Sequence, residues 1–390
     1  MAAGTLPVSD PRLLADIRRY GKFDTAACYQ CGSCTLSCDL VGDSATFPRR
    51  TIRYVLLGLR QPLVASLEPW VCHDCGDCSV VCPRQANPRI SMMTIRRFLS
   101  AQYDWTGLGA KLYQSDAWYV GSLVFVALLT IALIIGYHLW YLKMATGDFA
   151  SNSMQLGLEH MFPRMTYYTL AVILLPFLLL LSRVIQIWRL TMGGDQRMYI
   201  PLSAYFAEWW TYAYQSVTHA MLRKCPQKGR WLGHWLLAFG TVTMLVVKTF
   251  GLRWFQTDNI YALYNPQRWV GYLAAGCILY GIADISRGRW HAKKEFYKET
   301  HFHDVVFPVL IVLTVLSGLA AHILRYAGFA LACHYAYALH VIIATPMLVI
   351  EMSFGKWSHM VYRPLALYFL AVRERAAHQV PAGEAVPNAI

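Results

Sequence analysis

The sequence predicts an all-α protein in two parts, a water-soluble N-terminal part followed by a bundle of membrane-spanning helices. Of the 390 residues, 56% are hydrophobic and only 15% are charged, whereas an ordinary soluble domain carries about 25% charged residues. Residues 117–142 contain no Asp, Glu, Lys or Arg, which is long enough for a helix to cross a bilayer. Eight of the eleven cysteines lie between residues 28 and 82, in evenly spaced runs that indicate metal clusters rather than disulfides. Disordered, collagen-like and disulfide-stapled classes are therefore excluded.

Residues 1–116 are predicted to form the soluble domain. They hold 13 Lys plus Arg and 10 Asp plus Glu, and no apolar secretory segment follows Met1. We therefore expect this domain in the cytoplasm, where thiols stay reduced and can bind iron. The rest of the chain holds 22 basic and 12 acidic residues, with most of the basic ones in loops expected on the cytoplasmic side. The formal charge of +13 is then a signal of membrane topology, and nucleic acid is not expected as a partner.

Each cysteine run follows the spacing C-x-x-C-x-x-C-x-x-x-C. A 4Fe-4S cluster needs four converging thiolates, and in two-cluster ferredoxins the last cysteine of each run binds the other cluster. The second run ends in Pro83, as in that pattern, whereas Asp39 stands at the corresponding place in the first. Two zinc sites would use pairs of C-x-x-C motifs, which does not explain four evenly stepped cysteines twice. The predicted ligands are Cys28, Cys31, Cys34 and Cys82 for the first cluster, and Cys72, Cys75, Cys78 and Cys38 for the second.

The 33 residues between the two runs are predicted to be helical. The segment Pro48–Arg60 carries its apolar residues at helical spacing. The N-terminal part is therefore expected to be an α-helical ferredoxin domain with two 4Fe-4S clusters, rather than a small ferredoxin that alternates strands and helices.

Six membrane-spanning helices are predicted, within a membrane domain of residues 117–370. Residues 203–222 are rich in Trp and Tyr, so we expect them to form a helix in the membrane interface. A seventh crossing there would place four basic residues outside, against the positive-inside rule. With six crossings in the inner (cytoplasmic) membrane, both termini lie in the cytoplasm, and residues 371–390 are expected to be a disordered tail. The predicted spans are 117–142, 165–188, 231–252, 268–286, 303–325 and 333–352.

Histidines in the membrane domain point to haem. Histidine within lipid is costly unless it has a function, and haem b, held by neutral imidazoles, is the natural electron carrier after iron–sulfur clusters. His340 and His359 are 19 residues apart, about 28 Å along a helix, so they would serve two different haems. His234 matches His359 in depth, and His322 matches His340. The predicted haem ligands are therefore His234, His359, His340 and His322, with His138 and His219 as further candidates.

Other histidines and cysteines have simpler expected roles. His73 lies inside a cluster loop and is expected to form hydrogen bonds rather than to bind metal. His301 and His303 lie near several lysines and are expected to be solvated. The cysteines outside the two runs are expected to pack as apolar residues; they are Cys225, Cys277 and Cys333.

The sequence resembles one known family over residues 10–370. The stretch Cys28-Tyr-Gln-Cys-Gly-Ser-Cys, the stretch Trp70-Val-Cys-His-Asp-Cys-Gly-Asp-Cys and the cytochrome b-like part that follows are similar to the membrane subunit of the quinone-interacting membrane-bound oxidoreductase (Qmo) complex. That subunit is similar to a fusion of heterodisulfide reductase C (iron–sulfur) and E (cytochrome b) subunits. The resemblance implies electron exchange between menaquinone and flavin/iron–sulfur subunits that partner adenylylsulfate (APS) reductase in dissimilatory sulfur metabolism.

The end of the membrane domain also resembles the last helix of nitrate reductase gamma subunits. The histidines similar to His340 and His359, with Ser353-Phe-Gly-Lys before the second, bind two different haems there. His234 is similar to the ligand on the partner helix. A further histidine follows it by about ten residues in that pattern, but this sequence has Met244. The resemblance therefore leaves the partner of His340 open, with His322 or His138 as the substitute.

A quinone site moves protons together with electrons, so it needs an ionisable group close to a haem. Lys248 and Glu351 are the candidates, and a snorkelling lysine and an interfacial glutamate are the alternative interpretation. One alternative function is a heterodisulfide reductase-type or sulfite-pathway membrane subunit with a different cytoplasmic partner. A transporter or signalling module with a redox-sensing domain is another, although no repeated pair of broken helices indicates one.

Overall fold

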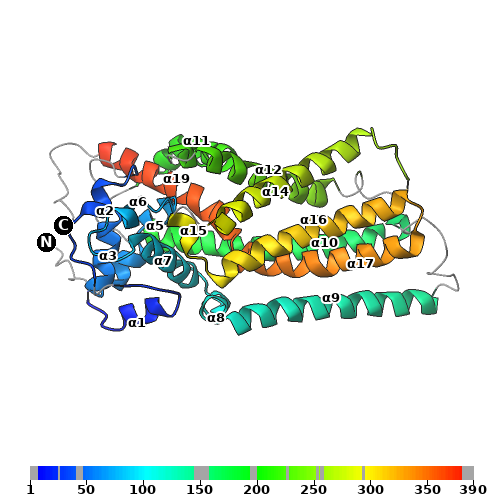
Figure 1. Ribbon diagram of the computed structural model, residues 1–390, viewed down its shortest axis with the longest axis horizontal. Helices are drawn as coiled ribbons and strands as arrows, with labels where there is room; N and C mark the ends of the chain where they lie inside the picture. Colours follow the sequence, from blue (N-terminus) through cyan, green and yellow to red (C-terminus); the bar gives the residue numbers. More distant parts are fainter. Residues whose placement is uncertain are drawn as a thin grey trace.

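The computed structural model describes residues 8–24, 27–40, 47–144, 158–193, 200–224, 228–251, 254, 259–291 and 295–379. Within these residues every regular element is a helix and none is a strand, which confirms the predicted fold class. The N-terminal helices gather at one end of the molecule, and long helices extend from them along its long axis (Figure 1). We call the end of the long helices next to the N-terminal domain the inner end, and the opposite end the outer end.

Short helices form the N-terminal domain around an apolar core. Their bounds are α1 Leu13–Arg18, α2 Ser33–Leu36, α3 Arg49–Leu56, α4 Arg60–Val64, α5 Glu68–Val71, α6 Asp77–Val80, α7 Pro88–Gln102 and α8 Leu108–Gln114. The amphipathic α7 buries Ile95, Phe98 and Leu99 in one cluster with Leu13 and Ile17 of α1. Burying each such side chain stabilises the fold by about 1.5–3 kcal/mol. Helices this short need that packing, because they are marginal in isolation.

Six long helices have the length and composition to cross a membrane. The first five lie within α9 Asp116–Met144, α10 Leu158–Met192, α12 Lys228–Phe250, α14 Pro266–His291 and α16 Phe302–Tyr326, and the sixth begins with α17 Ala330–Pro346. Each of them overlaps one of the six spans predicted from the sequence. Large apolar side chains on α9, such as Phe125 and Leu128, are 66% and 59% exposed. Such surfaces are expected where lipid rather than water is the neighbour.

The last span differs from the prediction. After Pro346, α17 continues through a π-helical turn, Met347–Glu351, and α18, Met352–Phe354, before the chain turns into α19, Ser358–Gln379. The predicted disorder of residues 371–390 is therefore wrong for residues 371–379, while residues 380–390 lie outside the described chain. The helix persists because Val372 is fully buried in the N-terminal core and Arg375 pairs with Glu208 at 2.6 Å.

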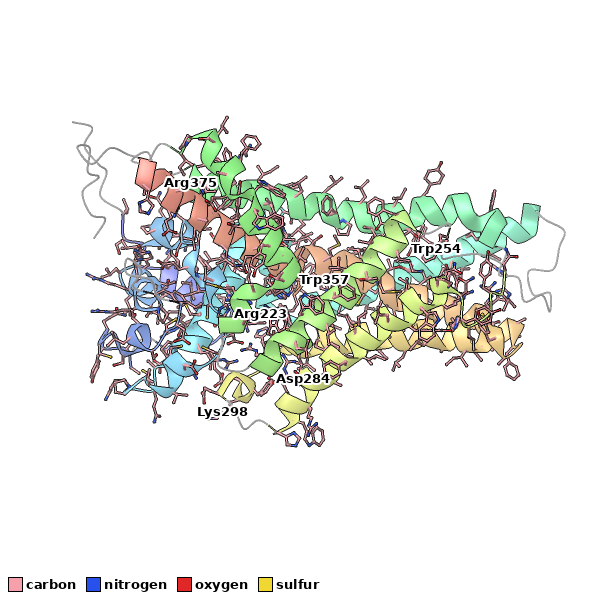
Figure 2. All side chains as sticks on the ribbon, turned by 90° about the horizontal axis from the view of Figure 1, so that it is seen from above. Arg223, Trp254, Asp284, Lys298, Trp357 and Arg375 are labelled. Atoms are coloured by element: carbon pink, nitrogen blue, oxygen red, sulfur yellow. The ribbon has the colours of Figure 1, made fainter. Side chains whose placement is uncertain are left out.

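α11, Leu202–Thr218, lies beside α19 at the inner end (Figure 1) and is followed by the short η1, Ala220–Lys224. It is not among the candidate spans. Its Phe206 and Trp210 are exposed, while the Tyr368 hydroxyl of α19 donates to the Tyr205 carbonyl at 3.0 Å. The interfacial position of this helix stays a prediction. Figure 2 shows basic side chains at the same end of the molecule, among them Arg223, Lys298 and Arg375.

The two domains are joined by buried contacts. Trp70 of α5 and Tyr103 after α7 pack edge to face on Tyr362 of α19, with ring centroids 5.1 and 6.2 Å away. Asp104 pairs with Arg183 of α10 at 3.0 Å, and both side chains are buried. Breaking a buried ion pair of this kind costs about 3–5 kcal/mol. The N-terminal domain is thus held firmly against the inner end.

The long helices are arranged as pairs. α12 packs closely on α14, because a Cβ at Gly240 would lie 2.5 Å from the Ala274 carbonyl oxygen and one at Gly281 would lie 2.6 Å from that of Gly233. Small residues allow such close helix packing in membranes. α16 and α17 form the second pair. The space between the two pairs contains the cavity beside His340 that is described below.

Candidate functional site

Cysteines from both runs surround one small cavity in the N-terminal domain. α2, which carries the end of the first run, lies on the side of this domain that faces away from the long helices (Figure 1). α2 begins directly after Gly32, whose φ is +88°, and this turn, which favours glycine, folds the loop back around the site. The cavity-lining cysteines are Cys28, Cys31, Cys34 and Cys82, the four that the sequence assigns to the first cluster.

The other four cysteines include the most buried of the eight in the two runs. Cys72 is buried, and Cys38 and Cys78 are its close neighbours. Burial, together with the neighbouring sulfur of Cys72, raises the pKa of Cys38 to about 11 and also raises the pKa of Cys78. Thiols in this setting stay protonated until a metal replaces the proton. Among the described residues, no three His, Cys, Asp or Glu side chains converge on a point that could hold a single metal ion.

Basic side chains from three helices hold the second cysteine loop. Arg96 of α7 donates to the Pro69 carbonyl at 2.6 Å and also to the Cys72 carbonyl. Arg230 of α12 donates to the Asp74 carbonyl at 3.1 Å, and Arg363 of α19 donates to His73 Nδ1 at 2.7 Å. The second cysteine group therefore faces the membrane domain, whereas Cys31 of the first group is exposed. His73 forms a hydrogen bond, as its position in the sequence predicts.

Three histidines meet at the inner end of the long helices. The rings of His234 on α12 and His359 on α19 have centroids 5.9 Å apart, and His234 Nδ1 lies 3.2 Å from His219 Nδ1. His359 Nδ1 donates to the Lys356 carbonyl. The Nδ1 atoms of His234 and His359, the facing pair, thus already form hydrogen bonds. Their Nε2 atoms are left available for a metal. Burial, followed by the charge of Arg363, lowers the pKa of His219 to about 4, so His219 is neutral at physiological pH.

A cavity of about 330 Å³ lies between the α12–α14 pair and the α16–α17 pair. His340 of α17 lines it, with Nδ1 2.9 Å from the Thr314 carbonyl oxygen and 3.1 Å from Ser317 Oγ. A carbonyl only accepts, so His340 Nδ1 carries the hydrogen and Nε2 keeps a free lone pair. Gly318 gives the ring its space, because a Cβ there would lie 3.2 Å from His340 Cε1.

The outer part of this cavity is strongly basic. Lys248, Arg268 and Arg325 line it, and no Asp or Glu does. Arg268 is 7% exposed, and its Nε and Nη2 atoms have no hydrogen-bond partner among the described residues. A buried guanidinium without acceptors is costly. The cavity therefore suits a ligand with a large apolar body and negatively charged groups at its outer end.

The sequence predicts two further histidines as haem ligands, and only one of them lines this cavity. His322 lines the cavity on the same helix as Arg325, and its Nε2 is 2.7 Å from the Tyr272 hydroxyl. His138 lies on α9 and does not line the cavity.

The prediction that His303 is solvated is wrong. The side chain is buried, with its ring centroid 4.0 Å from that of Tyr119, because the first turn of α16 packs against α9.

The two quinone-site candidates occupy different places. Lys248 lines the cavity, whereas Glu351 does not. Glu351 is fully buried and accepts hydrogen bonds from the Tyr119 hydroxyl and from the Lys356 backbone N–H at 2.9 Å. Trp357 lines the inner end of the cavity and is labelled between the N-terminal domain and the long helices in Figure 2.

Sequence reasoning missed the basic residues that surround these sites. Arg363 follows His359 by four residues, one helical turn, and that spacing was the only available signal. Nothing in the sequence indicates that Arg230 and Arg96 meet the same cysteine loop, because three helices from distant parts of the chain bring them there.

Comparison with known proteins identifies the N-terminal region. Residues 17–87 match the model of the 4Fe-4S dicluster domain. The chain is 30% identical over 95 residues to a protein of Archaeoglobus profundus that is like the C subunit of heterodisulfide reductase, a match that covers 24% of this chain and 50% of the relative. It is 38% identical over 94 residues to the C2 subunit of the H(2)/formate:CoB-CoM heterodisulfide,ferredoxin reductase of Methanococcus maripaludis, covering 24% of this chain and 48% of that protein.

The chain thus spans about half the length of these curated relatives. No solved structure matches it. Within these bounds, the N-terminal region matches a 4Fe-4S dicluster domain and is similar to the C subunits of heterodisulfide reductases. The relatives are named as, or as like, C subunits of heterodisulfide reductases. The six apolar helices add a multi-pass membrane domain to this iron–sulfur domain.

Proposed function

We propose that this chain carries electrons between a membrane quinone, through two haems b and two 4Fe-4S clusters, and cytoplasmic flavin/iron–sulfur subunits that exchange electrons with APS reductase. The observation that carries the proposal is the hydrogen bond from Arg363 to His73 at 2.7 Å. His73 adjoins Cys72, and Arg363 lies one turn from His359. The side chains of His73 and Arg363 therefore connect the second cysteine group with the inner histidine pair.

The inner histidine pair supports a bis-histidine haem. Imidazoles on opposite sides of one iron have centroids roughly 6 Å apart, since each metal–nitrogen bond is about 2 Å and each centroid lies about 1 Å beyond the nitrogen. The His234 and His359 centroids are 5.9 Å apart. His219, bonded to His234 Nδ1, orients that ligand and fixes its tautomer. In this proposal His219 is a positioning residue rather than an iron ligand.

The large cavity supports a second haem. His340 offers Nε2 from one wall, and the three basic side chains at the outer part can pair with the two propionates of the macrocycle. Nε and Nη2 of Arg268 lack hydrogen-bond acceptors among the described residues, and a propionate would supply them. When bound, the haem supplies one-electron exchange; the chain's own residues bind it, orient it and exclude water.

The order of sites suggests where the partners bind. The first cysteine group, with Cys31 exposed, lies on the side facing away from the long helices, so a cytoplasmic redox partner would approach there. A menaquinone would enter from lipid, with Lys248 or Glu351 as the proton-exchanging group. A heterodisulfide reductase-type or sulfite-pathway membrane subunit is the second candidate, favoured by the relatives of the iron–sulfur domain. The two candidates differ only in the soluble partner.

The test is purification of the chain with its partners from native membranes. We expect reduced haem b bands, iron for two clusters, and reduction of both by a menaquinol analogue or oxidation by the corresponding quinone. Co-purification with APS reductase activity supports the main proposal. Co-purification with a different sulfur enzyme favours the second candidate, and a spectrum without haem b would contradict both.

A further inference from the structure

The second haem site offers one histidine where two axial ligands are needed. This inference rests on the proposed function, in which the cavity beside His340 holds a haem. His340 belongs to the α16–α17 wall, so the opposing ligand must come from the wall formed by α10, α12 and α14. The side chains of that wall that line the cavity contain no histidine.

His322 is unsuitable as the opposing ligand. It lies on α16, on the same wall as His340, and its Nε2 is bonded to the Tyr272 hydroxyl at 2.7 Å. It also lies at a different depth. His322 precedes the outer end of α16, Tyr326, by four residues, about 6 Å of helix, whereas the Thr314 carbonyl that His340 contacts precedes it by twelve, about 18 Å. His138, on α9, is outside the cavity lining.

Among the described residues of the facing wall, the hydroxyls of Tyr168 and Tyr272 are already paired with Thr345 and His322. Two side chains there offer an amine or thioether lone pair, and both lie on α12. Lys248 lies two residues from the outer end of α12 and joins Arg268 and Arg325 in the basic region. Met244 lies one turn deeper and packs with Ile278 and Ile311. Ile311 lies one turn inside Thr314, whose carbonyl His340 contacts, so this packing places Met244 near the depth of His340. Helical side chains also lean toward the N-terminus of their helix, which for α12 is the inner end.

We propose that Met244 is the second axial ligand of the haem bound by His340, which makes this a histidine–methionine site beside the bis-histidine site at the inner end. A thioether binds haem iron opposite histidine and raises the reduction potential relative to two histidines. Met347 lines the same cavity, but it is on His340's wall and its sulfur accepts from the Thr314 hydroxyl at 3.6 Å. It therefore serves as the matched control.

The test compares spectra and haem potentials of the full chain in detergent or nanodiscs with Met244→Leu, Met244→His and Met347→Leu. We expect Met244→Leu to turn one of two low-spin haems high-spin or to lose it, and the long-wavelength charge-transfer band of methionine-bound ferric haem to disappear. Met244→His should restore two low-spin haems, one with a lower potential than in the unchanged protein. Met347→Leu should leave the spectrum unaltered.

Two low-spin haems in Met244→Leu, or loss of the haem in both Met244 variants, would overturn the methionine assignment while the proposed function stands. The presence of only one haem in the unchanged protein would instead contradict the second haem of the proposed function, and the assignment with it. Haem content by pyridine haemochrome assay separates these two results without any measurement of activity.

Discussion

The inner histidine cluster and the outer cavity are built in opposite ways. The inner site brings together three histidines, and the Nδ1 atoms of its facing pair are already bonded. In the outer cavity, His340 has its Nδ1 bonded in the same way. Apolar side chains and three cations line the cavity around it. In the proposed function, the difference means that the inner haem site is specified by side-chain hydrogen bonds at the domain junction. The outer haem site is specified by a preformed cavity with complementary charge between the long helices.

The largest expected effect is the separate loss of each haem. Because His359 and His340 lie in different sites, His359→Ala should remove the inner haem alone and His340→Ala the outer haem alone. Haem content should fall from two to one in each variant, with two different sets of α bands missing in low-temperature spectra. Unchanged iron and sulfide content checks that the N-terminal domain still folds. Loss of the same bands in both variants would show that His359 and His340 bind the same haem, contrary to the prediction.

His219 tests whether the inner site depends on a supporting hydrogen bond. Replacing such a partner of a metal-binding histidine typically lowers metal affinity by 10–100-fold. We expect His219→Phe to weaken retention of the inner haem by a factor in this range, measured by haem transfer to apomyoglobin. The outer haem should be retained normally. His322→Phe is the matched control, and it should leave the inner haem unaffected.

Arg363 tests the connection between the cysteine loop and the inner site. Arg363→Leu removes the bond to His73, and small misplacements of reacting groups, about 1 Å, cost up to 10²-fold in rate. We expect electron transfer between cluster and haem to slow by roughly tenfold or more, with cofactor content unchanged, in laser-flash measurements. Arg375→Leu, on the same helix but paired with Glu208, should leave the rate as it was.

The smallest expected effect concerns the basic end of the outer cavity. A fixed positive charge favours the reduced haem, so Arg268→Gln should lower the potential of the outer haem. We expect a change of roughly 1 kcal/mol, or about 40 mV, and no shift of the inner haem in a redox titration. An equal shift of both haems would show that the charge acts on the whole domain rather than on one site.

Much of this organisation could be predicted from sequence, because the signals are local. Charge-free runs mark the long helices, and evenly stepped cysteines mark the iron–sulfur region. The tail prediction failed because the last helix is stabilised by contacts with α11 and the N-terminal core, not by its own apolar period. The buried position of His303 and the meeting of Arg363 with His73 depend on packing between distant segments, which spacing along the chain does not reveal.

The most direct test of the central claim is reoxidation of the reduced clusters by menaquinone confined to nanodiscs. Such quinone cannot reach the N-terminal domain through water, so electrons must pass through the membrane domain. We predict rapid loss of the reduced-cluster EPR signal in the unchanged protein and a loss slower by at least 10²-fold in His359→Ala. Equal rates in the two proteins would contradict the account.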